Sequence, residues 1–90
     1  MFKTLEELLN TIRDRKKNPS ETSYTNKLLN NKELSKKKII EELSELIEAV
    51  EKNTNKIHES ADVLYHLLVY LEANNIKIED VMKELEKRRK

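Results

Sequence analysis

The sequence predicts an all-α protein, and three observations support that prediction. The 90-residue chain has no glycine and one proline, and 39% of its residues are charged whereas 4% are aromatic. Leucine, isoleucine and valine recur at spacings of three and four, the period of a helix that buries one face. Alternating runs between regularly spaced turn residues, typical of β-sheet proteins, are missing from the sequence. We therefore expect a single all-α domain over residues 1–90.

Two helices separated by a polar segment are expected at the start of the chain. The first should begin near Thr4, because the segment TLEE has the form of a capping box with Thr4 as its N-cap. Pro19 disfavours helical angles at the residue before it and so ends this helix. A second helix of two turns or fewer is expected at 24–30. Asn31 should close it in the left-handed conformation, which asparagine tolerates better than most residues.

Two long helices and a shorter last one are expected in the rest of the chain. The first long helix covers about 34–52, and the turn-prone segment NTN at 53–55 ends it. The second covers about 56–73 and is apolar on several sides, which predicts a central position. A last amphipathic helix follows at about 78–89. Because the break at 53–55 is short, the two long helices should form an antiparallel hairpin.

The size of the chain suggests that it associates with a second copy. A domain of this length buries only about 60–65% of its unfolded surface, and small domains usually need additional stabilisation. The sequence has no cysteine and therefore no disulfide to supply it. The helix at 56–73 is apolar on more sides than one small chain can cover. We expect a four-helix-bundle-like core that two hairpins complete by dimerisation.

The charge balance gives no reason to expect a nucleic acid or a membrane as partner. The chain has 18 basic and 17 acidic residues, and its net charge is +1. The longest mostly apolar stretch, 63–71, is far shorter than the roughly 20 residues of a membrane-spanning helix. The N-terminal segment lacks the features of a secretory signal, and the absence of cysteine fits a reducing compartment. We expect a soluble cytoplasmic protein.

Two pairs of acidic residues predict a metal site between the long helices. Glu42 and Glu45 are three residues apart, as are Glu59 and Asp62, so each pair lies on one helix face. An antiparallel hairpin can turn the two faces toward each other. Four converging carboxylates repel one another unless a cation lies among them. Because carboxylate oxygens suit Mg²⁺ or Mn²⁺, we expect one of these ions to be held here.

Several polar residues near these acids have a structural and a functional interpretation. Glu41 and Glu48 fit ordinary solvent-facing glutamates, which are common on helices. Asp62 fits less well, because aspartate is a poor helix former and lies between apolar residues of the central helix. His66 is either a structural histidine or a residue that contacts the metal ligands or a phosphate. The lysines at 36–38 form either a solvated face or a phosphate contact beside the metal site.

The spacing of these acids, ExxE at 42–45 and ExxD at 59–62, resembles that of the MazG-type all-α nucleotide pyrophosphohydrolases. In that superfamily the four acids hold catalytic Mg²⁺. The segments NPSETSYTNKLL, KKIIEELSEL and ESADVLYHLLVYL narrow the resemblance to the phosphoribosyl-ATP pyrophosphatase family and cover nearly the whole chain. The resemblance implies Mg²⁺-dependent hydrolysis of 1-(5-phosphoribosyl)-ATP to 1-(5-phosphoribosyl)-AMP and pyrophosphate, the second step of histidine biosynthesis. It also implies a homodimer or a higher homo-oligomer.

The sequence departs from the usual pattern of that family at three positions. Asn31 stands where a glycine is usual, which agrees with a left-handed helix end. Ile40 replaces a glycine just before the paired glutamates and affects the expected local helix packing. Lys77 replaces a serine or similar capping residue before the last helix. None of these departures removes a predicted metal ligand.

The resemblance also implies roles for individual residues in catalysis. A bound Mg²⁺ lowers the pKa of its water, and either Glu42 or Glu41 could take the proton of that water. Lys38 could stabilise charge on the phosphates. The residues expected to contact the substrate or to close over it are Ser23, Tyr24 and Thr25, with His66 as a further candidate.

Two other functions are compatible with the same sequence. One is a MazG-like pyrophosphohydrolase that acts on another nucleoside or deoxynucleoside triphosphate. The segments SYT and YHLLV argue against it. The other is a helical interaction module without enzymatic activity, for which neither Mg²⁺ dependence nor sensitivity at Asp62 is expected.

Overall fold

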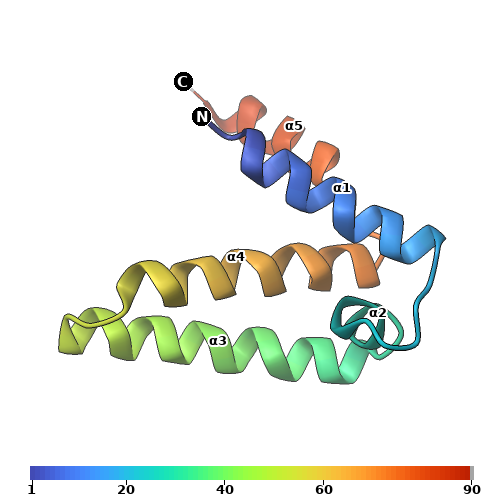
Figure 1. Cartoon of the computed structure of the whole chain (residues 1–90). Helices are drawn as coiled ribbons and strands as arrows, with labels where there is room; N and C mark the ends of the chain where they lie inside the picture. The colour runs from blue at the N-terminus through green and yellow to red at the C-terminus, as the bar shows by residue number, and fades with distance from the viewer. Residues whose placement is uncertain (90) are drawn as a thin grey trace.

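The all-α prediction is confirmed by the computed structural model, which describes residues 1–89. Within this range the chain forms five α-helices and no β-strand (Figure 1). The helices are α1 (Lys3–Lys17), α2 (Tyr24–Leu29), α3 (Lys32–Lys52), α4 (Lys56–Ala73) and α5 (Ile78–Arg88). None of the described helices is long and apolar enough to cross a lipid bilayer.

Helices α3 and α4 form the antiparallel hairpin that the sequence predicts, and they lie side by side along their length (Figure 1). The turn between them depends on asparagine. Asn53 has φ 55° and Asn55 has φ 48°, so both adopt the left-handed conformation that most residues avoid. The amide of Thr54 donates to the carbonyl of Ala49 at 3.0 Å and closes the end of α3. The predicted break at 53–55 and the predicted bounds of α4 are therefore confirmed.

The buried core lies where α1, α2 and α4 meet, at the C-terminal half of α4. Its members are Ile12, Leu28, Leu29, Leu68, Val69 and Ala73. Figure 1 shows α1 crossing over this part of α4, with α2 next to the start of α3. The N-terminal half of α4 and the facing part of α3 extend beyond this core. The acid pairs lie on that extension.

A row of exposed aliphatic side chains, here called the apolar stripe, runs along the hairpin. These side chains remain between 39% and 88% exposed. The apolar stripe consists of Ile40, Leu43, Ile47 and Val50 on α3, and of Ile57, Leu64 and Leu67 on α4. The exposure of these side chains agrees with the prediction that one copy of the chain cannot cover the central helix.

Two predicted helix ends are wrong. The N-cap of α1 is Phe2, whose carbonyl accepts from the amide of Glu6, so Thr4 lies inside the first turn and makes no cap. Asn31 is extended, with φ −138°, and not left-handed. Only Asn30 and Asn31 separate α2 from α3, and Asn31 caps the start of α3, where its side chain accepts from the amide of Leu34 at 3.0 Å. Asn30 closes α2 instead.

The other two departures from the family pattern have small structural effects. Ile40 lies inside α3, which runs without interruption from Lys32 to Lys52. Lys77 is the N-cap of α5 and makes no side-chain cap hydrogen bond, because a lysine ammonium cannot accept one.

A buried asparagine joins the segment after α1 to α2. The amide group of Asn26 donates to the carbonyl of Arg15 at 2.6 Å, and its oxygen accepts from the amide of Ser20 at 2.7 Å. Both partners are backbone groups outside α2: the carbonyl belongs to α1, and the amide belongs to the polar segment that follows α1. Asn26 therefore fixes the polar segment against α1 and sets the position of the residues that follow Ser20.

Candidate metal centre

Three of the four predicted metal ligands converge between α3 and α4. Glu42 and Glu45 are one turn apart on α3, and Glu59 faces them from α4. One carboxylate oxygen of each lies within 4.8 Å of the others. The convergence follows from the sequence spacing, because the three-residue step aligns the first two carboxylates and the antiparallel turn brings the third opposite them.

The carboxylates of this group lack the partners that buried charges need. The Oε2 atoms of Glu42 and Glu59 are buried and have no hydrogen-bond partner among the described residues. Burial, followed by interactions with the Glu45 carboxylate, raises the pKa of Glu42 above its ordinary value. Burial and the charge of Glu45 also raise the pKa of Glu59. A divalent cation would supply the missing positive charge, so the donor set fits such an ion.

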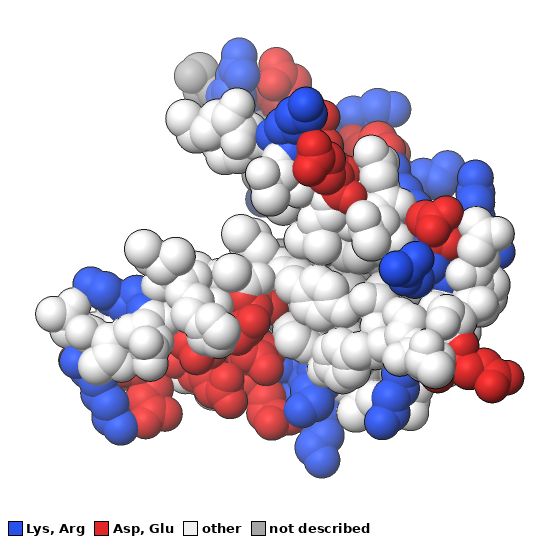
Figure 2. Space-filling view, viewed as in Figure 1, with Lys and Arg blue, Asp and Glu red and all other residues white. Residues whose placement is uncertain are grey.

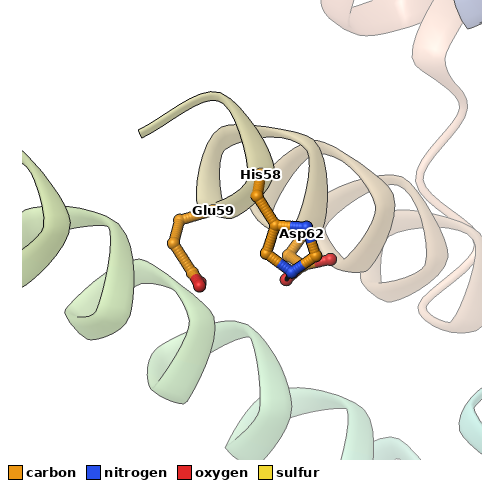
Figure 3. A group of neighbouring side chains, drawn as sticks. All are labelled: His58, Glu59 and Asp62. Atoms are coloured by element: carbon orange, nitrogen blue, oxygen red, sulfur yellow. Dashed lines mark ion pairs between the residues drawn. The ribbon is translucent and has the colours of Figure 1, made fainter. Parts of the chain in front are cut away.

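Asp62 joins the same cluster through a second, overlapping group. It lies one turn after His58 on α4, and its Oδ2 is 3.4 Å from the Nε2 of His58. Together with Glu59, these residues offer three ligand atoms within 4.8 Å of one another. Figure 3 shows the Glu59 carboxylate directed toward α3 and the His58 ring beside the Asp62 carboxylate. We call the five residues Glu42, Glu45, His58, Glu59 and Asp62 the acid cluster.

His58 was missed by the sequence analysis, although a signal for it was present. It lies four residues before Asp62, the spacing that places two side chains on one helix face. His66, four residues after Asp62, was considered in the sequence analysis, but the histidine four residues before it was not.

The two candidate bases occupy different positions. Glu42 belongs to the acid cluster, and its buried Oε2 is free of hydrogen bonds. Glu41 is exposed, and its Oε2 lies 3.7 Å from the Nζ of Lys38. Figure 2 shows acidic side chains gathered over the middle of the hairpin, with basic side chains on both flanks. The geometry therefore favours Glu42 over Glu41 and places Lys38 at the edge of the acidic patch.

His66 is buried and uses both of its ring nitrogens. Nδ1 lies 2.8 Å from the backbone carbonyl of Asp62, which can only accept, so Nδ1 carries the proton. In the neutral ring Nε2 is then the acceptor for the hydroxyl of Tyr24 at 3.1 Å. His66 thus connects Tyr24 to the turn of α4 that contains Asp62. In this arrangement neither nitrogen is free for a phosphate.

The SYT segment holds α2 against α4. The Oγ of Ser23 accepts from the amide of Asn26 at 3.3 Å and caps α2. The hydroxyls of Thr25 and Tyr65 lie 2.5 Å apart, and the rings of Tyr24 and Tyr65 stack with centroids 6.4 Å apart. Burial raises the pKa of Tyr24. Of the three predicted substrate contacts, Tyr24 alone keeps an exposed ring surface beside the acid cluster.

Two cavities formed by the described residues lie away from the acid cluster. The larger, about 940 Å³, lies between α1 and α5 and is lined by Arg13, Glu72 and Glu79 among others. The guanidinium of Arg13 pairs with both Glu72 and Glu79 in this lining. The smaller, about 480 Å³, is lined by the segment from Pro19 and the start of α2. Neither of these cavities coincides with the acid cluster, so the candidate site is defined by its carboxylates and not by a cavity.

Comparison with known proteins agrees with the resemblance seen in the sequence. The family model described as phosphoribosyl-ATP pyrophosphohydrolase matches residues 5–89. The phosphoribosyl-ATP pyrophosphatase of Clostridium novyi (strain NT) is 50% identical over 91 residues, which cover 96% of this chain and 81% of that protein. The phosphoribosyl-ATP pyrophosphatase of Clostridium acetobutylicum is 52% identical over 89 residues, covering 93% of this chain and 79% of that protein.

A longer relative contains a similar region as part of its chain. The histidine biosynthesis bifunctional protein HisIE of Pyrococcus furiosus is 48% identical over 87 residues, which cover 96% of this chain but 41% of that protein. The matches with these three relatives extend over nearly the whole of α1 to α5, so they include both acid pairs and the SYT segment. The chain belongs to the phosphoribosyl-ATP pyrophosphohydrolase family.

Proposed function

We propose that this chain hydrolyses the α–β phosphoanhydride of 1-(5-phosphoribosyl)-ATP. The products are 1-(5-phosphoribosyl)-AMP and pyrophosphate, the second step of histidine biosynthesis. Family membership over residues 5–89 supports the choice of substrate. The observation that supports the chemistry is the acid cluster, in which two buried carboxylate oxygens have no hydrogen-bond partner within residues 1–89. A triphosphate is strongly anionic, and it needs a cation between itself and such a cluster.

The residues that would hold the cation are Glu42, Glu45, Glu59 and Asp62. A divalent ion bound there, Mg²⁺ or Mn²⁺, would neutralise phosphate charge and lower the pKa of a coordinated water. Glu42 is also the proposed general base, because a carboxylate that gives one oxygen to the ion can take the proton of the attacking water with the other. Lys38 lies one turn before Glu42 on the same helix and pairs with Glu41, and it would contact the phosphates.

The SYT segment would cover the substrate from the side of α2. His66 and Tyr65 hold Tyr24 and Thr25 through hydrogen bonds, so the backbone of this segment is fixed next to α4. The exposed ring of Tyr24 is then the group available to pack against a nucleotide or ribose. We assign Ser23 and Thr25 to positioning this ring, because their hydroxyls already have protein partners.

The apolar stripe is the proposed contact with a second copy of the chain. Ile40, Leu43, Ile47 and Val50 alternate at spacings of three and four, the pattern of a helix that packs along another helix. Two hairpins joined through this surface would form a four-helix bundle. Figure 2 shows uncharged side chains covering part of the hairpin next to the acidic patch, so a partner would lie close to the acid cluster. Light scattering at micromolar concentration should give a dimer or larger, and Ile47→Glu should give a monomer.

The function is tested by measuring pyrophosphate release from 1-(5-phosphoribosyl)-ATP with and without Mg²⁺. Release that requires the metal, and that is much faster than release from deoxynucleoside triphosphates, supports the proposal. Faster release from a deoxynucleoside triphosphate would instead indicate the other branch of the superfamily. If no triphosphate is hydrolysed with either Mg²⁺ or Mn²⁺, the chain is better described as a helical interaction module.

A further inference from the structure

His58 is the member of the acid cluster for which the proposed reaction gives no role. It lies on the first turn of α4, and its side chain is 73% exposed. Its Nε2 is 3.4 Å from the Oδ2 of Asp62, a separation too long for a good hydrogen bond. The imidazole lies beside the carboxylate, and a protonated His58 would form an ion pair with Asp62 at this distance (Figure 3).

This separation is close to that of two ligands of one metal ion. Ligands at right angles around an ion, each at about 2.1 Å, lie about 3 Å apart. The ligand atoms of His58, Glu59 and Asp62 already lie within 4.8 Å of one another, so small side-chain rotations would bring all three onto one ion. Residues four apart on a helix face are a known arrangement of metal ligands, as in zinc sites with two histidines at this spacing.

A second observation indicates that this group could bind a cation. Glu59 belongs both to the group with His58 and to the group with Glu42 and Glu45. Its Oε2 is buried without a hydrogen-bond partner among the described residues. An ion next to Glu59 on the side of Asp62 would satisfy that oxygen and would have the imidazole of His58 within reach.

We propose that His58 is a ligand in this metal site and that its imidazole shifts the preference of the site from Mg²⁺ toward first-row transition ions such as Mn²⁺ and Co²⁺. The inference rests on the proposed function, because it requires the carboxylates to hold a metal. Carboxylate oxygens alone suit Mg²⁺, whereas neutral imidazole is a common ligand of transition metals and a rare one of Mg²⁺. The nitrogen of His58 therefore adds affinity for one class of ion.

The simpler explanation of His58 is an exposed ion pair with Asp62. Such pairs on a helix surface contribute little to stability and have no metal selectivity. The two explanations therefore differ in one measurable property. A metal ligand changes the ratio of Co²⁺ affinity to Mg²⁺ affinity when it is removed, and a surface ion pair does not.

The test is to titrate the full chain with Mg²⁺, Mn²⁺ and Co²⁺ by calorimetry, and to record the visible absorption of bound Co²⁺. The variants are His58→Gln, His58→Glu and Asp62→Asn, with Ser60→Ala as the control on the same helix. Ser60 donates its hydroxyl to the carbonyl of Lys56 and belongs to neither ligand group. Because His58 is exposed, its variants should fold, and circular dichroism checks this.

We expect His58→Gln to weaken Co²⁺ binding about tenfold or more and to change the Co²⁺ spectrum, while Mg²⁺ affinity changes less than about twofold. His58→Glu should strengthen Mg²⁺ binding without restoring the Co²⁺ affinity. If His58→Gln leaves the Co²⁺ to Mg²⁺ ratio unchanged while Asp62→Asn abolishes binding of both ions, the inference is wrong and the proposed metal site stands. If the parent binds no divalent ion, both are wrong.

Discussion

Helix α4 contains two carboxylate sites that differ in what faces them. Near its start, Glu59 and Asp62 face other carboxylates from α3. Near its end, the buried Glu72 accepts from the Nε of Arg13 at 2.9 Å, and the two Nη atoms of the same guanidinium bind Glu79 at 2.8 and 2.6 Å. The Nζ of Lys16 donates a hydrogen bond to the backbone carbonyl of Glu72 at 2.6 Å. We call these groups of α1, α4 and α5 the arginine network.

The pKa values of the two sites move in opposite directions. Hydrogen bonds from Arg13 lower the pKa of Glu79 from its ordinary 4.5 to about 2. Burial and neighbouring carboxylates raise the pKa values of Glu42 and Glu59. The arginine network is therefore complete within the protein, and it joins three helices. Within residues 1–89, the carboxylates of the acid cluster that face one another have no basic side chain between them. Their residual negative charge would favour a bound cation, as the proposed function requires.

The largest expected difference between the two sites is in catalysis. Asp62→Asn keeps the shape of the side chain but removes one charge and one strong metal ligand. It should lower pyrophosphate release on the order of a hundredfold or more, while the metal-free fold stays at least as stable because repulsion is relieved. The matched control is Glu48→Gln on α3, whose side chain pairs with Lys52 and lies outside the cluster. Full activity of the Asp62 variant would show that the acids are structural.

Metal addition should stabilise the fold through the acid cluster. A ligand that binds only the folded state at about a hundred times its dissociation constant stabilises that state by about 2.7 kcal/mol. For a domain of this size this corresponds to a rise in melting temperature of roughly 10–20 °C. Thermal unfolding followed by circular dichroism, with and without Mg²⁺, measures the rise. Asp62→Asn should show much less of it, and an unchanged melting temperature for the parent would count against the metal site.

Removal of the guanidinium should affect stability and leave the chemistry intact. Arg13→Gln leaves the buried Glu72 with Lys16 as its nearest cation, 3.8 Å away. We expect a loss of about 1–3 kcal/mol in the free energy of unfolding, measured by urea denaturation. Lys52→Gln, which breaks the exposed pair with Glu48, is the control and should change stability by less than about 0.5 kcal/mol. A large loss of pyrophosphate release by folded Arg13→Gln would contradict the separation of the two sites.

The smallest expected effect is on the acid sensitivity of the arginine network. Because the folded-state pKa of Glu79 is about 2 and its ordinary value is 4.5, its contribution is present above pH 4.5 and is lost as the pH falls through about 2. Glu79→Gln should flatten the stability profile in this window. In the acid cluster the raised pKa values predict the opposite sign, since protonation relieves repulsion in the metal-free protein. Urea midpoints measured across this pH range, for the parent and for Glu79→Gln, would show no difference if Glu79 made no such contribution.

The acid cluster was largely predictable from the sequence, because its members are close along the chain. A three-residue step within each helix and a short turn between the helices are enough to align Glu42, Glu45, Glu59 and Asp62. The bounds of α4 were predictable for the same reason, since asparagines flank a strongly periodic segment. Whether these carboxylates hold a metal stays a prediction.

The arginine network and two helix caps were not predictable in this way. Arg13 meets Glu72 and Glu79 across 59 and 66 positions, and no local pattern indicates which of 17 acidic residues would face a given guanidinium. Thr4 and Asn31 have the side chains of caps, but the neighbouring backbone decides which residue begins a helix. Helix α1 begins two residues earlier than a Thr4 cap would require, so Thr4 lies inside its first turn. Because two residues separate α2 from α3, Asn31 caps the start of α3 and does not close α2.

The short reach of the acid cluster along the chain has a consequence for the order of folding. All five of its residues lie in one hairpin, between positions 42 and 62, whereas the arginine network spans most of the sequence. Contacts between nearby residues form fastest, because closing a short loop loses little chain entropy. The left-handed asparagines at 53 and 55 also restrict the unfolded turn more than glycines would. The ligand geometry can therefore form in the hairpin of α3 and α4 before α1 and α5 pack together.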